Sequence, residues 1–479
     1  MSVSLVVLWT DAFIYLLLVL SVGFGIYASR HEHLRAPWQR VLRSPLAMAS
    51  VVVLGVYVGI GLLDTVHFRP KAAEGTGTSQ GPLPAPLGYW PSLAKEGAPT
   101  GQILSLLDLA LSGLRGRGEK TYSAPLATHA FVKEAIEGPD GIVVRDYPRL
   151  VWGGRHLEDP ERDRLPDIAG KALLGAAGGL VVWGLLGLGA RAFRPQLGAR
   201  ASRPPDPIPW RAAYVTLGVI LTLGFAIGTL AQFYHVLGTD KVGEDVLYQA
   251  LKGIRTGLVI GTLTTLVMLP AAILLGIMAG YFRGWVDDLI QYLYTTLNSI
   301  PGVLLIAAAI LMLQVYMSNH EDQFTSLVQR ADLRLLFLCL ILGVTSWTGL
   351  ARLLRGEALK LREADYVQSA VALGVGHLTI IGRHLVPNVL HIVLITVVLD
   401  FSGLVLAEAV LSYVNIGVDP TMNSWGNMIN SARLELARDP VVWWSLAAAF
   451  LFMFTLVLAA NLFADAVRDA FDPRLRGAA

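Results

Sequence analysis

Two carboxylic acids, Asp400 and Glu408, lie inside one long apolar stretch of the chain, from 389 to 413. A carboxylate at the centre of a membrane helix costs about 2.5 to 3.5 kcal/mol on insertion scales, so it must face protein or water rather than lipid. Asp400 can line a path through the membrane, where it would attract an amino group or another cation. It can equally be a buried acid that is neutral or held by hydrogen bonds. Glu408 lies nearer the outer end, and we expect it to have a structural role.

A histidine, His391, shares this stretch with Asp400, and the pair raises the question of an enzyme. Nine residues along a helix correspond to about 13.5 Å of rise, which is too far for a catalytic dyad on one helix. An intramembrane enzyme is therefore the least favoured function. The sequence contains no H-E-x-x-H motif, and its single cysteine, Cys339, lies in another apolar stretch. An intrachain disulfide and a thiolate metal cluster are thus excluded, and we expect no metal site.

A second group of informative residues lies in the polar loop from 361 to 387. Gly374 suits the end of a short helix, because glycine adopts positive φ without steric cost. A later helical segment carries the cation Arg383, and Pro387 stands where a new helix can begin. Such a short helix either lies in the groove of a partner protein or rests on the membrane surface, and its pattern leaves both open. Its apolar face is formed by Tyr366, Val367, Ala370, Val371 and Leu373.

The composition shows which elements must position these residues. Of the 479 residues, 54% are hydrophobic and only 15% are charged, whereas a soluble domain has about a quarter of its residues charged. The net charge of +2 supplies no basic excess for a nucleic acid, so we expect the lipid bilayer and no nucleic acid as a partner. Apolar stretches long enough to cross a membrane occur nine times, at 5–28, 45–63, 172–190, 212–231, 256–281, 300–316, 335–353, 389–413 and 441–463.

The distribution of lysine and arginine predicts the orientation of these spans. One set of alternate loops holds 18 Lys and Arg residues, and the short loops of the other set hold seven. The richer side is expected to be the cytoplasm, which places the N-terminus outside and the C-terminus inside. The first span lacks a basic leading region and a small-residue cleavage site, so its pattern is not that of a signal peptide. The richer set comprises 30–43, 191–211, Arg283, 352–383 and 468–476.

One long segment between the spans, from 64 to 170, is rich in proline, glycine and charge. It contains an amphipathic helical pattern at 103–114 and a possible strand at 142–144. The segment is long enough for a small folded domain, though a marginal one. The alternation of loops places it outside the cytoplasm. Its role stays open, either as a contact for another protein or as a cover of the outer mouth.

The loop from 361 to 387 resembles the coupling loop of ABC importer permeases, whose pattern is E-A-A, three residues, Gly and a later Leu-Pro. Gln368-Ser369-Ala370 stands at the acidic-Ala-Ala position, Gly374 at the glycine, and Val386-Pro387 at the Leu-Pro. The surrounding sequence, DYVQSAVALG and IIGRHLVPNVL, is similar to that of permeases in the dipeptide/oligopeptide/nickel branch. HVLGTDKVGEDVL resembles the extracytoplasmic motif of that branch, with Glu244 where the family usually has Arg. The matching positions of this outer motif are His235, Gly238, Thr239, Asp240, Gly243 and Asp245.

The resemblance covers 38–63 and 233–476, and it implies six family-like spans, so three of the nine are extra. It predicts an all-α polytopic membrane protein with an extra N-terminal span, an insertion domain and an extra transmembrane hairpin. The expected divisions are 1–37 for the extra span and its loop, 38–63 for the first family-like span, 64–170 for the insertion, 171–232 for the hairpin and 233–479 for the permease domain.

The resemblance also implies function and partners. A permease of this class pairs with a second permease subunit, two ATP-binding cassette subunits and an extracytoplasmic binding protein, in the bacterial inner membrane. No G-x-x-x-x-G-K-[ST] occurs in this sequence, so we expect ATP to be bound by the partners and no cofactor by this chain. The expected function is import of peptides, nickel chelates or opines by a transport subunit that is not an enzyme. Proton-coupled transport with Asp400 as the relay remains the alternative. The residues expected to couple to the ATPase are Tyr366, Gln368, Ser369, Ala370, Gly374, Arg383 and Pro387.

Overall fold

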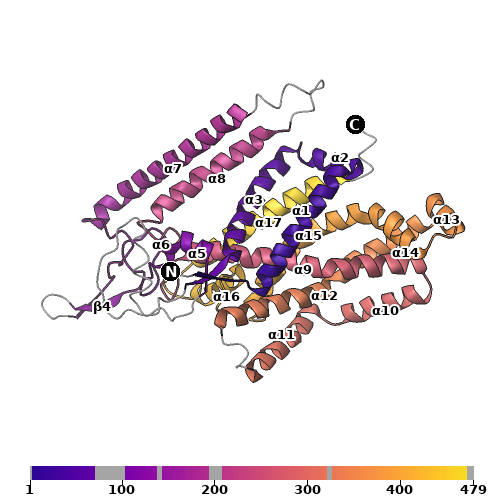
Figure 1. Cartoon of the computed structure of the whole chain (residues 1–479). Coiled ribbons are helices and arrows are strands. Elements are labelled where there is room, and N and C mark those ends of the chain that lie inside the picture. Colours follow the sequence, from indigo (N-terminus) through magenta and orange to yellow (C-terminus); the bar gives the residue numbers. More distant parts are fainter. Residues whose placement is uncertain (1–2, 71–102, 138–142, 194–207, 321–325, 472–479) are drawn as a thin grey trace. The chain divides into compact units, whose positions relative to one another are not determined.

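Long helices dominate the fold (Figure 1). The structure, a computed structural model, describes residues 3–70, 103–137, 143–193, 208–320 and 326–471. Within these residues nine helices are long and apolar enough to cross a membrane, which confirms the predicted number of spans. They are α1 (Trp9–Arg30), α3 (Pro45–Thr65), α7 (Pro160–Phe193), α8 (Trp210–Leu230), α9 (Val246–Phe282), α11 (Gly302–Asn319), α12 (Leu327–Arg362), α15 (Val386–Tyr413) and α17 (Trp444–Phe471).

Shorter helices and strands connect these spans. Two small sheets occur among the described residues, one with the order β1-β2-β3 and one formed by β4 and β5. The helices are α2 (Glu32–Val41), α5 (Leu106–Ala110), α6 (Ser112–Arg115), α10 (Trp285–Ser299), α13 (Asp365–Ala372), α14 (His377–Ile380), the π-helical turn η3 (Ile381–Leu385) and α16 (Trp425–Glu435). The strands are β1 (Val3–Val6), β2 (His67–Pro70), β3 (Leu104–Ser105), β4 (Glu134–Glu137) and β5 (Val143–Asp146).

Several boundaries differ from those expected. The first span was predicted to begin at residue 5, but Val3–Val6 is a strand that pairs antiparallel with His67–Pro70, and the helix begins at Trp9. The amphipathic pattern at 103–114 is divided into β3, α5 and α6, because Ser105 and Asp108 form a capping box that starts a new helix. The strand predicted at 142–144 corresponds to β5, except for residue 142, which lies outside the described residues.

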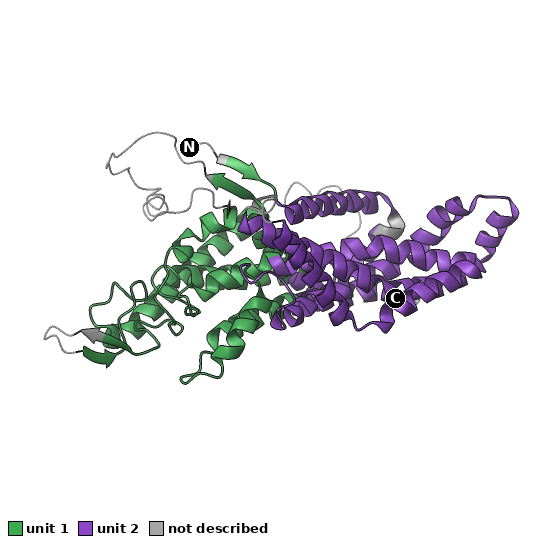
Figure 2. Ribbon diagram, turned by 90° about the horizontal axis from the view of Figure 1, so that it is seen from below, with its two compact units in different colours: residues 1–7, 51–255, 423–456 green, residues 8–50, 256–422, 457–479 purple. Residues whose placement is uncertain are grey.

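The chain divides into two compact units, each built from three segments (Figure 2). Unit 1 comprises 1–7, 51–255 and 423–456. Unit 2 comprises 8–50, 256–422 and 457–479. The described part of the insertion therefore clusters with the extra hairpin, the outer motif and the segment that contains α16.

In unit 1, the extra hairpin is held together by glycine. A Cβ atom on Gly179 of α7 would lie 2.7 Å from the Leu221 carbonyl oxygen of α8, so only glycine permits this approach of the two backbones. Trp183 donates to the Tyr214 carbonyl, and the Tyr214 hydroxyl donates in return to the Trp183 carbonyl, at 2.8 and 2.9 Å. Leucine and valine side chains cover the rest of the hairpin and are exposed, as expected for helices that face lipid.

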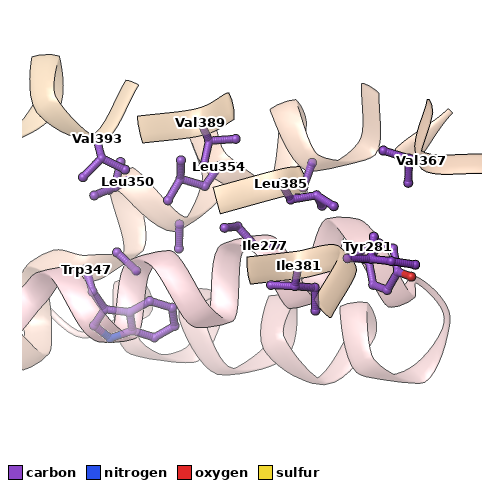
Figure 3. Packing of buried hydrophobic residues seen from close by; sticks show 14 of the residues in the cluster. Ile277, Tyr281, Trp347, Leu350, Leu354, Val367, Ile381, Leu385, Val389 and Val393 are labelled. Atoms are coloured by element: carbon purple, nitrogen blue, oxygen red, sulfur yellow. The ribbon is translucent and has the colours of Figure 1, made fainter. Parts of the chain in front are cut away.

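In unit 2, α9 and α12 meet at Gly276 and Gly280 of α9. A Cβ atom on Gly280 would lie 2.6 Å from the Arg355 carbonyl oxygen, so the two helices are in backbone contact there. Beside this contact, a buried apolar cluster joins α9, α12, α13, η3 and α15 (Figure 3). Its labelled members are Ile277, Tyr281, Trp347, Leu350, Leu354, Val367, Ile381, Leu385, Val389 and Val393.

Candidate functional site

The predicted coupling loop folds as two short helices separated by a glycine turn. Gly374 has φ +77°, and its left-handed conformation ends α13 after Ala372. The Val375 amide donates to the Ala370 carbonyl at 3.0 Å, which caps the last turn of the helix. The π-helical turn η3 follows α14, and α15 then begins with Pro387 in its first turn, where no amide donor is needed.

The loop buries one face and exposes the other. Val367 and Ala370 are buried in the cluster with α9, α12 and α15. Most of the other side chains point outward, and Leu373 and Leu378, on either side of Gly374, are 83% and 84% exposed. Two leucines at this exposure form an apolar tip that suits a groove on a partner. Of the predicted coupling residues, Tyr366, Gln368, Ser369, Gly374, Arg383 and Pro387 are exposed, whereas Ala370 is buried.

Polar contacts fasten the base of this loop to the helices of unit 2. The Tyr281 hydroxyl, one residue before the end of α9, lies 2.9 Å from Nδ1 of His377. At the start of α13, the Asn388 side-chain amide donates to the Tyr366 hydroxyl at 3.1 Å and to the His384 carbonyl at 2.7 Å. Sequence reasoning missed these partners, because the spacing of Tyr281 and His377 along the chain carries no signal of their contact.

A bidentate ion pair joins α12 to α10. Arg355 donates from Nε and Nη2 to the two carboxylate oxygens of Asp287, at 2.6 and 2.7 Å. These hydrogen bonds lower the pKa of the Asp287 carboxyl, against the opposing effect of its burial. The pair holds α10, an amphipathic helix that the sequence reading missed, against the helix that leads into the coupling loop. Its signal in the sequence was the helical spacing of apolar residues from 285 to 299.

In unit 1, the predicted outer motif surrounds a buried histidine. Nδ1 of His235 lies 2.7 Å from a carboxylate oxygen of Asp245, and its Nε2 lies 3.5 Å from Oε1 of Glu119. Glu119 belongs to the insertion, and its carboxylate also accepts from the amides of Val151 and Trp152 at 3.0 and 2.8 Å. Burial alone would lower the pKa of His235, but the two carboxylates outweigh it and raise the pKa to about 9.

Backbone atoms of the insertion also form hydrogen bonds with the outer motif. The Glu119 amide donates to the Gly243 carbonyl at 2.9 Å, and the Thr239 amide donates to the Ser123 carbonyl at 3.1 Å. Gly243 has φ +81°, and a Cβ atom there would overlap the Glu119 carbonyl. A Cβ atom on Gly238 would likewise lie 2.4 Å from the Ser123 carbonyl oxygen. Both glycines of the motif thus serve to receive the insertion, a role that sequence reasoning did not assign.

A second ionic cluster joins the insertion to α3 and α9 within unit 1. Nζ of Lys252 lies 2.6 Å from Asp64 and 3.0 Å from Asp108, and the Tyr248 hydroxyl donates to Asp108 at 2.7 Å. Burial favours the neutral form of Asp108, but Lys252 and the hydrogen bonds dominate and lower its pKa to about 2. The insertion is therefore attached by buried charge as well as by backbone contacts.

The two acids of α15 have different surroundings. Glu408 is 1% exposed and accepts from the Ser412 hydroxyl at 2.8 Å. Asp400 is half-buried and makes no hydrogen bond or ion pair with the residues that the structure describes. The structure gives Asp400 and His391 no shared contact, and among the described residues no group of His, Cys, Asp or Glu could hold a metal ion.

Comparisons with known proteins agree with these features. Residues 272–477 match the family described as "Binding-protein-dependent transport system inner membrane component". The glutathione transport system permease protein GsiD of Pectobacterium atrosepticum is 32% identical over 244 residues, which are 50% of this chain and 73% of that protein. The oligopeptide transport system permease protein OppC of Haemophilus influenzae is 31% identical over 244 residues, 51% of this chain and 71% of that protein.

A dipeptide permease shows the same partial coverage. The dipeptide transport system permease protein DppC of Lactococcus lactis is 30% identical over 240 residues, 50% of this chain and 64% of that protein. About half of the present chain therefore lies outside each alignment. The nine long apolar helices within the described residues and the extent of these alignments lead to one conclusion: the chain belongs to the family of binding-protein-dependent transport system inner membrane components and is a multi-pass permease of the inner membrane.

Proposed function

We propose that this chain is one of two permease subunits of an ATP-driven importer for peptides or closely related small solutes. Three relatives that support this proposal are named for the transport of glutathione, oligopeptides and dipeptides. We infer that the partners are a second permease, two ATPase subunits and an extracytoplasmic binding protein. ATP would be bound by the ATPase subunits, since the sequence of this chain has no phosphate-binding loop.

The proposal also includes the orientation predicted from the basic residues. The loop with α13 and α14 then lies in the cytoplasm, and the insertion and the outer motif lie outside. Asp400 and Glu408 belong to the helix that follows the coupling loop, and we place Asp400 on the translocation path. Its half-buried carboxylate, which has no partner among the described residues, supports this assignment.

The observation that carries the proposed coupling is the two-sided burial of the loop. One face, with Val367 and Ala370, is packed into the core of unit 2, and the other presents Leu373 and Leu378. An ATPase that holds the two leucines can therefore move the packed face and the helices joined to it. Such a bundle has two states, and contacts that depend on ATP shift the balance between them.

The test is to replace both exposed leucines, as Leu373→Asp/Leu378→Asp. Because both side chains are exposed, we expect the free energy of unfolding of the purified subunit to change by no more than about 0.5 kcal/mol, and its apparent Tm to change little. The ATPase subunits should no longer co-purify, and uptake should fall at least tenfold. Val242→Asp is the matched control, since Val242 is 64% exposed in the outer motif and should retain the ATPase. Full co-purification by the leucine variant would contradict the proposal.

The alternative is a proton-coupled transporter with Asp400 as the relay. It is favoured by the same carboxylate, which has no partner among the described residues. The two functions differ in one measurement. Purified chain in liposomes would transport substrate under a proton gradient without an ATPase only in the alternative, and Asp400→Asn would then abolish that transport.

A further inference from the structure

The helix α2 is held at a membrane surface by the two spans that it connects. α1 has 22 residues and α3 has 21, so each is about 32 Å long, close to the roughly 30 Å of a hydrocarbon core. α1 ends at Arg30 and α3 begins at Pro45. The segment between them has 14 residues, ten of which form α2. Because both of its ends are fixed at the edge of the bilayer, α2 stays at the level of the lipid headgroups.

The apolar side of α2 is occupied by the protein itself. Val41 is buried in a cluster with Val467 and Phe471 of α17. The Trp38 ring packs against the rings of Phe463 and Phe471, with centroids 6.4 and 5.8 Å away. These contacts fix the rotation of α2 about its own axis. The opposite side therefore points away from α17.

That opposite side is basic. Arg35 and Arg40 of α2 lie within an arc of about 140° when each residue turns by about 100°, and Arg43 follows two residues after the helix ends. All three are exposed, as is Arg30 at the end of α1. Among the described residues, Arg30, Arg35 and Arg40 have no ion pair and no side-chain hydrogen bond.

Few acidic groups compensate this charge. The stretch from 30 to 43 contains four arginines and a single acid, Glu32. On α17, the exposed Asp465 and Asp469 project from the side opposite to Val467 and Phe471, by the same helical geometry. Arg30, Arg35 and Arg40 thus form a cationic surface that makes no ion pair or side-chain hydrogen bond with the described residues.

We propose that α2 is a binding surface for anionic phospholipid, with Arg30, Arg35 and Arg40 holding the headgroup phosphates. Arginine suits this role because its planar guanidinium donates two parallel hydrogen bonds to a phosphate. The occupant is lipid rather than a soluble protein, because the two spans bring these side chains to the headgroups. With the orientation proposed above, this leaflet is the cytoplasmic one, which carries the anionic lipid.

The single buried cysteine makes a local test possible. Cys339 is fully buried, so a cysteine introduced as Gln39→Cys, on the exposed arc between Arg35 and Arg40, can be labelled selectively with a donor dye. The full chain, with the subunits that co-purify, is placed in phosphatidylcholine nanodiscs. Trace acceptor dye is carried on the acyl chain of either phosphatidylglycerol or phosphatidylcholine. We expect energy transfer to report a several-fold preference for phosphatidylglycerol, which 0.5 M salt weakens.

Two variants decide the proposal. Arg35→Gln/Arg40→Gln should remove most of the preference, because two of the three arginines proposed to hold the phosphates are lost. Arg35→Lys/Arg40→Lys should retain the larger part of it. The matched control, Lys120→Gln/Lys133→Gln, removes two exposed cations of the insertion and should change nothing. Equal transfer from both lipids, an unaffected glutamine variant, or a dye shielded by an ATPase subunit whatever the lipid would each overturn the proposal.

Discussion

Gly374 has a left-handed backbone conformation, and the space around its Cα atom is open. Its φ is +77°, which is costly for any residue with a Cβ atom, yet nothing lies within 4 Å of the position of that atom. The residue is therefore needed for the turn and not for close packing. This distinction allows the turn to be changed without creating a clash.

We expect Gly374→Ala to cost about 1 to 2 kcal/mol locally, because the left-handed conformation is strained for alanine. The turn should open, the orientation of Leu373 relative to Leu378 should change, and uptake should fall. Uptake and the ATPase rate are measured together in the assembled transporter. Gly376→Ala is the matched control, because Gly376 has φ −61° and also has open space around it. Equal effects of the two substitutions would contradict the assignment.

His235 makes the attachment of the insertion dependent on pH. Its pKa is raised from 6.5 to about 9, so the protonated form is the one that stabilises the folded state. Its contribution is fully present below about pH 6.5 and is lost as the pH rises through about 9. We expect the apparent Tm of the purified chain to fall between pH 7 and pH 9.5, by an amount corresponding to about 2 to 3 kcal/mol.

The variant Glu119→Gln isolates this effect. Removal of one carboxylate lowers the pKa of His235, so the loss of stability should begin at a lower pH than in the natural chain. Glu158→Gln, which removes an exposed acid of the same segment, should leave the pH profile unchanged. A profile of Glu119→Gln identical to that of the natural chain would show that Glu119 does not hold the charge of His235.

At the scale of elements, the pair of Arg355 and Asp287 should connect α12 to α10 energetically. Both side chains are partly shielded and the contact is bidentate, so a double-mutant cycle with Arg355→Gln and Asp287→Asn should give a coupling of about 1 to 2 kcal/mol. The neighbouring pair of Arg283 and Glu363 is about half exposed and should give about 0 to 0.5 kcal/mol. Thermal unfolding of the four variants of each cycle provides the measurement, and similar couplings for both pairs would be the contradicting result.

The sequence predicted the spans better than the elements between them. Long apolar stretches identify helices that cross a membrane, because the lipid leaves the backbone no other partner than itself. The same reasoning missed β1, since a strand of four residues is defined by pairing with His67–Pro70, about 60 residues away. It also placed the start of the fifth span at residue 256, whereas α9 is one continuous helix from Val246 to Phe282.

The candidate sites were predictable to different depths. The glycine turn and the position of Pro387 in the coupling loop followed from local spacing. The contact of His235 with Glu119 did not, because it joins residues 116 positions apart and no motif includes Glu119. Local geometry is encoded locally, whereas the partner of a buried charge depends on the packing of the whole unit.

At the scale of the whole molecule, the part of the chain that matches the permease family, residues 272–477, contributes to both units. Unit 1 combines the extra hairpin and the described insertion with the outer motif and with α16. The alignments with the curated permeases cover only about half of the chain. In unit 1 the outer motif binds the insertion through Gly238, Thr239 and Gly243.

The contact between the outer motif and the insertion bears on how related chains diverge in sequence. Its hydrogen bonds are made largely by main-chain atoms, from the Glu119 amide to the Gly243 carbonyl and from the Leu126 amide to the His235 carbonyl. Hydrogen bonds made by main-chain atoms do not depend on which side chain a residue carries. The sequence of the insertion can therefore change while its backbone path is kept. Related chains that carry such a segment should then share its backbone path and an acidic residue that faces the imidazole at the position of His235. The rest of the segment should differ in sequence.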